Sequence, residues 1–161
     1  MHRQIFFCKS WFRAKKRPTE IWSMEQAKLA HEAGQTYTVL VDSPERPFCF
    51  LEVTKGFVGV CFLDKQLREN LNYQFKEVEP GKLFLAMATY REFDGDDERV
   101  VSGTSYIFGN NGDVNIKRET FLPEHCLETS ISRAEVSSNY AEFPAFGEYD
   151  SLIQIERSQS V

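Results

Sequence analysis

Tyr37-Thr-Val-Leu-Val-Asp42 opens the stretch of sequence that decides the fold, and this stretch continues to Glu119. Within it, apolar, aromatic and β-branched residues form a series of short runs that are typical of β-strands. Turn residues such as Ser43-Pro44 and Thr54-Lys55-Gly56 separate the runs. Because parallel strands need long crossover connections, these short links predict antiparallel neighbours, with about six or seven strands in the stretch.

Alternation within the runs predicts which side chains share a face of the sheet. After Pro47, the side chains of Cys49, Leu51 and Val53 should point one way and that of Phe50 the other. The run from 57 to 63 is apolar throughout, which predicts a central strand buried on both faces. In the next run, apolar and polar residues alternate, which predicts a half-exposed strand whose buried side chains are Leu71, Tyr73 and Phe75.

Other local signals complete the predicted fold. Ser23 and Gln26 have the spacing of a capping box at the start of a helix that ends near Gly34. Asn110-Asn-Gly112 predicts a hairpin with a type I′ turn. We further expect a helical turn within 64–70, a short helix over 130–141 and a final strand over 151–156. The predicted class is α+β: a predominantly antiparallel β meander, as a curled sheet or open barrel, with one N-terminal helix packed on it.

The whole chain, 1–161, is predicted to form a single domain, because no linker or repeat divides it. Residues 157–161 are expected to be a frayed tail. Residues 1–17 form an arm in which basic residues alternate with aromatic ones. Such a pattern can bind single-stranded nucleic acid or a membrane surface. We favour a first strand or a docking arm whose aromatic residues pack on the sheet and whose cations face an acidic body. A start codon assigned too far upstream is a further alternative.

The charge distribution is uneven. The net charge is −5, but residues 1–20 carry six basic residues against one acidic residue, whereas the remainder carries 13 basic and 23 acidic residues. An acidic body repels nucleic-acid phosphates and anionic lipid and favours a basic protein partner. No apolar run approaches the roughly 18 residues of a membrane span, and no signal peptide is recognisable. We therefore expect a cytoplasmic protein that binds neither nucleic acid nor membrane.

The cysteines and histidines do not form a recognisable catalytic or metal-binding motif. Cys8, Cys49, Cys61 and Cys126 contain no CxxC spacing, which favours reduced thiols, although a Cys49–Cys61 bridge between adjacent strands remains open. A nucleophilic cysteine would require that Cys126 meet His31, since adjacent residues such as His125 and Cys126 point to opposite faces of a strand. No zinc-ligand spacing occurs either.

Residues 94–98, Asp-Gly-Asp-Asp-Glu, have enough carboxylates to suggest calcium. Arg99, however, stands where an EF-hand requires glycine, so a solvated hairpin tip is the favoured interpretation. Phosphate-binding loops and nucleophile elbows are also missing from the sequence. We therefore predict no catalytic residues, no metal ion and no cofactor, and do not favour an enzyme.

In size, acidity and element order, a capped helix followed by a strand meander, the sequence resembles bacterial toxin-immunity proteins. The resemblance implies stoichiometric binding that neutralises a basic toxin. The residues that we expect at this contact are the loop carboxylates with two aromatic anchors: Asp94, Asp96, Asp97, Glu98, Tyr90 and Tyr106. One alternative is a small-molecule carrier or enzyme that uses the aromatic-lined mouth of a β-barrel. A nucleic-acid-binding module acting through the arm is a third hypothesis.

Overall fold

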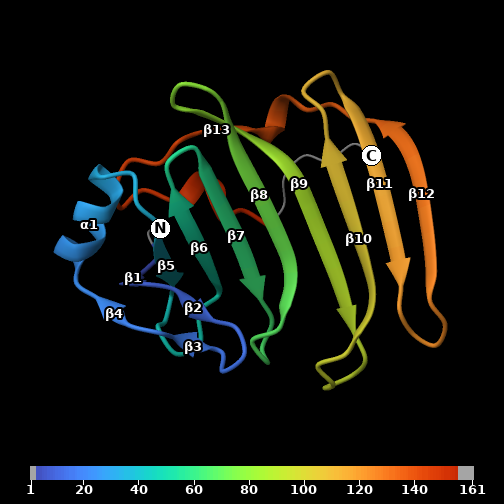
Figure 1. Ribbon diagram of the computed structural model, residues 1–161, viewed down its shortest axis with the longest axis horizontal. Coiled ribbons are helices and arrows are strands. Elements are labelled where there is room, and N and C mark those ends of the chain that lie inside the picture. Colours follow the sequence, from blue (N-terminus) through green and yellow to red (C-terminus); the bar gives the residue numbers. More distant parts are fainter. Residues whose placement is uncertain (1–2, 156–161) are drawn as a thin grey trace.

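A single antiparallel sheet dominates the computed structural model of the protein, which describes residues 3–155. Ten of its eleven strands follow the spatial order β12-β11-β10-β9-β8-β7-β6-β5-β1-β4 (Figure 1). From β5 to β12, every strand pairs with its neighbour in sequence. The sheet is open and does not close into a barrel. These ten strands are β1 (Ile5–Cys8), β4 (Ile21–Trp22), β5 (Tyr37–Val41), β6 (Cys49–Thr54), β7 (Phe57–Leu63), β8 (Glu69–Glu79), β9 (Lys82–Phe93), β10 (Val100–Phe108), β11 (Asp113–Thr120) and β12 (Cys126–Arg133).

The predicted α+β class is confirmed, including the helix. Helix α1 (Met24–Glu32) begins at Ser23, and the reciprocal hydrogen bonds between Ser23 and Gln26 complete the capping box. The helix buries the small side chains of Ala27 and Ala30 and contacts β1, β4 and β5. Small residues on this face allow the helix to lie close to the sheet.

The two faces of the sheet differ in what covers them. We call the face that carries Cys49, Leu51 and Val53 the inner face; its buried side chains belong to the larger hydrophobic cluster. The opposite face, which carries Phe50 and Cys61, is the outer face and contributes to a smaller cluster. This assignment confirms the predicted alternation. It also excludes a Cys49–Cys61 bridge, because the two thiols lie on opposite faces and are free.

The C-terminal segment covers part of the inner face. It contains the 3₁₀ turns η1 (Ser137–Asn139) and η2 (Asp150–Leu152), and between them β13 (Tyr140–Glu142), the eleventh strand, which pairs with the start of β9. Tyr149, Leu152 and Ile153 are buried in the larger cluster. The predicted helix over 130–141 is wrong, because residues 126–133 pair with β11 instead. The predicted strand over 151–156 is also wrong, since Leu152 enters the core from a 3₁₀ turn; residue 156 and the predicted tail lie outside the described residues.

A two-stranded hairpin covers part of the outer face. It consists of β2 (Trp11–Phe12) and β3 (Arg17–Pro18), which pair with each other and not with the main sheet. Trp11 is buried and stacks on Phe50 of β6, with ring centroids 5.5 Å apart. Trp11 of the N-terminal arm thus packs on the sheet, as the sequence analysis favoured, whereas Phe12 is exposed.

Two turns differ from their predicted form. The hairpin between β10 and β11 is present, but among its residues only Gly112 has a positive φ, of 94°, whereas a type I′ turn needs positive φ at both central positions. Residues 64–70 form a turn in which the backbone N–H of Leu67 donates to the Asp64 carbonyl, and β8 begins at Glu69 without a helix.

None of the helices within residues 3–155 has the length and apolar character that a membrane span requires.

Candidate binding surface

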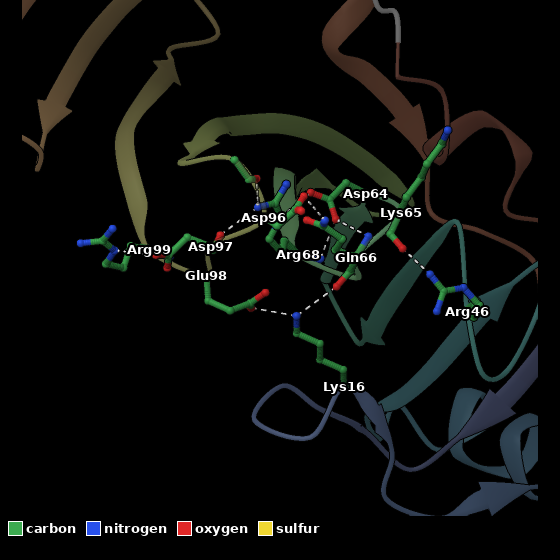
Figure 2. Close-up of polar contacts among 11 residues, drawn as sticks. Lys16, Arg46, Asp64, Lys65, Gln66, Arg68, Asp96, Asp97, Glu98 and Arg99 are labelled. Carbon is green, nitrogen blue, oxygen red and sulfur yellow. Dashed lines mark hydrogen bonds and ion pairs between the residues drawn. The ribbon is translucent and has the colours of Figure 1, made fainter.

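The acidic loop 94–98 connects β9 to β10, and side chains from elsewhere in the chain hold it. Arg99 pairs with Asp97 at 2.8 Å and with Asp94 at 3.4 Å. Lys16 of the hairpin pairs with Glu98 at 2.8 Å, and the Gln66 amide donates to the Asp96 carboxylate at 2.5 Å (Figure 2). All four predicted loop carboxylates therefore have a partner within the molecule.

Arg68 connects this loop to the turn at 64–68. Its guanidinium pairs with Asp64 at 2.8 Å and donates to the backbone carbonyls of Gly95, at 2.7 Å, and Asp97, at 2.8 Å (Figure 2). Partial burial alone would raise the pKa of the Asp64 carboxyl, but hydrogen bonds from Arg68 and Gln66 hold it below its ordinary value. Because one charged side chain fixes two loop carbonyls, the loop backbone is held in one arrangement.

The loop retains negative charge despite these contacts. Its four carboxylates face two cations, Arg99 and Lys16, which leaves two negative charges uncompensated. The partner of Asp96 is a neutral amide. The side chains of Asp94 and Glu98 are each 61% exposed. A hydrogen bond from the Arg99 backbone N–H is the main cause of a lowered pKa at Asp97.

The two predicted aromatic anchors lie on the inner face, away from this network. Tyr90 is opposite Leu71 on β8 and opposite Thr104 on β10, which places it with the inner-face residues. Tyr106 lies diagonally across from it, and the two rings meet edge to face with centroids 5.8 Å apart. Tyr90 is half exposed, whereas Tyr106 packs against the larger cluster. The six predicted residues therefore divide between the loop and the inner face.

A polar groove of about 660 Å³ lies on the outer face, between the hairpin and the acidic loop. Side chains of β8, β9 and β10 line it, together with Glu98 of the loop and Trp11 of the hairpin. The polar residues among these strands are Glu69, Asn72, Gln74, Thr89, Arg91 and Ser105. The sequence analysis did not identify this groove; the signal for it was the row of polar residues that alternates with Leu71, Tyr73 and Phe75.

Two of the three arginines that line the groove, Arg13 and Arg91, lie in different charge environments. Arg13 of the hairpin lies between Glu52, at 3.0 Å, and Glu69, at 3.1 Å. Burial opposes the charge of Arg13, but its two carboxylate partners raise its pKa above the ordinary value and keep it protonated. Arg91 has no ion pair among the described residues. The groove can therefore accept both hydrogen-bonding and negatively charged groups of a ligand.

Three of the four thiols are buried, and the fourth, Cys126, is exposed. Burial raises the pKa of Cys8 and of Cys61 to about 12 and raises that of Cys49 further, so all three are protonated at neutral pH. Cys126 is exposed on the edge strand β12, whereas His31 lies on α1. In Figure 1, α1 and β12 lie at opposite ends of the row of strands. Within residues 3–155, no three His, Cys, Asp or Glu side chains cluster closely enough to hold a metal ion.

A smaller cavity, of about 290 Å³, lies between the end of α1 and the β6–β7 turn. At its wall, His31 Nδ1 is 2.8 Å from the Tyr37 hydroxyl, which is 2.9 Å from the Tyr149 hydroxyl. Burial lowers the pKa of His31, and the nearby Glu32 only partly offsets this effect. The sheet stays open, so no closed barrel is present within residues 3–155.

Comparison with protein-family models, with curated proteins and with solved structures found no match in any of the three.

Proposed function

We propose that the protein is a non-catalytic binding domain that forms a stoichiometric complex with a basic protein partner. The observation that carries this proposal is the acidic loop 94–98, which is held in place from three sides and retains an excess of negative charge. Side chains of the loop remain exposed, so cationic groups of a partner can reach them.

The contacts that hold the loop are an advantage for binding. Ordering a flexible loop on association costs free energy, and a loop that is already ordered avoids this cost. Arg68 orders the loop by donating hydrogen bonds to two backbone carbonyls, so the loop carboxylates are not used for this contact. The uncompensated charges would then accelerate encounter with a positively charged surface more than they would set the final affinity.

Within this class, a cytoplasmic protein that neutralises a basic toxin, as bacterial immunity proteins do, is the role that we propose. The acidic body, and the burial that keeps Cys8, Cys49 and Cys61 protonated, support a protein that recognises its partner without changing it chemically. The polar groove lies beside the loop and provides further hydrogen-bonding groups for the same partner.

The test uses Asp96→Lys, because among residues 3–155 the hydrogen-bond partner of the Asp96 carboxylate is a neutral amide, so that its replacement leaves the loop's ion pairs intact. We expect the wild-type chain to retain a basic protein in affinity capture, at a 1:1 ratio by mass measurement of the complex, and Asp96→Lys to lose it. Charge reversal of a pair of loop residues, Asp96 and Asp97, should abolish capture as well, but Asp97 also orders the turn through Arg99.

The matched control is Glu148→Lys, which changes the charge equally at an exposed position in the C-terminal segment. It should bind the partner as the wild type does, and both variants should unfold at nearly the wild-type temperature. Equal capture by Asp96→Lys and the wild type would remove the loop from the interface.

A further inference from the structure

Strand β12 leaves one long edge of the sheet without a partner. It pairs with β11 over eight residues in continuous register, from Asp113 opposite Arg133 to Thr120 opposite Cys126. Within residues 3–155 nothing pairs with its other side, and Figure 1 shows β12 at the end of the row of strands. An edge of this length presents a row of free N–H and C=O groups, which can pair with another strand.

The direction of these backbone groups follows from one hydrogen bond. The N–H of Ala134 donates to the carbonyl of Gly112, so even-numbered residues of this strand turn their backbone groups toward β11. The odd-numbered residues, Leu127, Thr129 and Ile131, therefore turn theirs toward the free edge. Their side chains also share the outer face of the sheet, because side-chain direction and hydrogen-bonding direction alternate together.

The usual protections of an edge strand are weak here. β12 contains no lysine, proline or bulge, whereas the opposite edge of the sheet, β4, is only two residues long. The exposed odd-numbered face is apolar in part, with Ile131 79% exposed and Leu127 50% exposed. The one acidic residue of the strand, Glu128, points to the inner face, opposite Arg118 of β11.

We propose that β12 is a self-pairing edge: two copies of this chain join their β12 strands in antiparallel orientation about a twofold axis centred on Thr129. In this register Leu127 lies opposite Ile131 of the second copy, and the reverse, so the exposed apolar side chains form two cross-strand pairs. The backbone groups that the single chain leaves free then bond to each other, and one continuous sheet passes through both molecules.

Sequence complementarity selects this register among its neighbours. Shifting the axis to Glu128 would place this carboxylate opposite its own copy, and like charges directly opposite are unfavourable. Shifting it to Ser130 would place Leu127 opposite Arg133 and separate the apolar pairs. With the axis at Thr129, Glu128 lies opposite Ser130 of the second copy, and no like charges of β12 meet. The proposal is independent of the proposed function, because the acidic loop does not belong to this edge.

The first experiment measures the mass of the full chain in solution by sedimentation velocity and light scattering. We expect the wild type to dimerise and Thr129→Pro to be monomeric, because proline removes an N–H that faces the free edge and leaves the β11 ladder intact. Ile131→Lys should raise the dissociation constant by about tenfold through the loss of two apolar pairs. Ile107→Lys, on the same face but on β10, should keep the wild-type value.

The second experiment tests the register by oxidation and does not depend on Thr129→Pro folding. Cys126 lies opposite Ser132 of the second copy, in a pair without mutual hydrogen bonds, where Cα atoms are about 4.5 Å apart and a disulfide can form. Ser132→Cys should therefore give a covalent dimer on mild oxidation, whereas Ser130→Cys, facing Glu128, should not. A wild type that remains monomeric at every concentration, or cross-linking of Ser130→Cys in preference to Ser132→Cys, would overturn the proposal.

Discussion

The two halves of the sheet have the same meander connectivity but very different surroundings. In β5 through β7 every inward-facing position is buried, as are Leu71, Tyr73 and Phe75 of β8, and β5 and β7 are buried on both faces. In β10 through β12 most side chains are half-buried or exposed, and β12 is exposed along almost its entire length. The comparison teaches that pairing between sequence neighbours is sufficient to build the second half. The first half has the same pairing and, in addition, buries its side chains in the core.

The two chain ends cause this difference, because both fold back over the first half. The N-terminal hairpin places Trp11 on Phe50 of the outer face. The C-terminal segment places Tyr149 against Tyr37 of the inner face, 112 positions away in sequence. Strands β11 and β12 receive little of this cover and keep surface that is free to contact other molecules.

The largest effect should come from emptying the core of the covered half. Phe75→Ala removes a fully buried ring from β8 and should lower the free energy of unfolding by about 3–5 kcal/mol. Ile107→Ala, in the open half and 42% exposed, should change it by no more than about 0.5 kcal/mol. Urea titration measures both values, and similar losses in the two variants would contradict the division into halves.

A smaller effect should come from a buried hydroxyl. Tyr37→Phe leaves the Tyr149 hydroxyl and His31 without the group that now joins them, which should cost about 1–3 kcal/mol. Tyr106→Phe is the matched change in the open half, where no hydrogen bond of the phenol to another described residue is found, and should cost about 0.5 kcal/mol or less. Chemical denaturation of both variants distinguishes them, and an equal cost would show that the Tyr37 hydroxyl contributes nothing particular.

The smallest effect concerns pH. Because burial lowers the pKa of His31, the unfolded chain binds a proton at this residue more readily than the folded chain. Its contribution to stability is therefore complete above the ordinary histidine pKa of about 6.5 and is lost as the pH falls below that value. Thermal unfolding between about pH 5 and pH 8 should show this decline in the wild type and in Ile107→Ala, and a flatter profile in His31→Gln. Parallel profiles for all three proteins would refute it.

The predicted elements came from signals that are local in sequence. Alternation between residues 37 and 119 predicted the strands there, which the structure confirms as β5 to β11, and the Ser23–Gln26 spacing predicted α1. Strand β12 was missed because, after Thr120, Ser and Thr become common and the apolar–polar alternation is lost. Pairing with β11 determines the actual conformation, since the strand preference of a residue depends on its neighbours in the sheet.

The candidate binding surface was harder to predict because distant segments build it. Residues 94–98 were recognisable as an acidic loop, but the contacts that hold it come from Lys16, Gln66 and Arg68. Tyr90 and Tyr106 lie apart from the loop because their side chains occupy the inner face of β9 and β10, and the sequence did not predict which face that would be. The groove depends on the hairpin lying over the sheet, and no short sequence motif encodes that position.

The position of the C-terminal segment has a consequence for biosynthesis. Tyr149, Leu152 and Ile153 complete the inner face, yet they leave the ribosome after every strand of the meander has been made. A nascent chain can therefore pair its strands early while much of its apolar face still lacks cover, and such surfaces are prone to aggregation. We expect the interval before residues 149–153 emerge to be the period in which this protein depends most on chaperones.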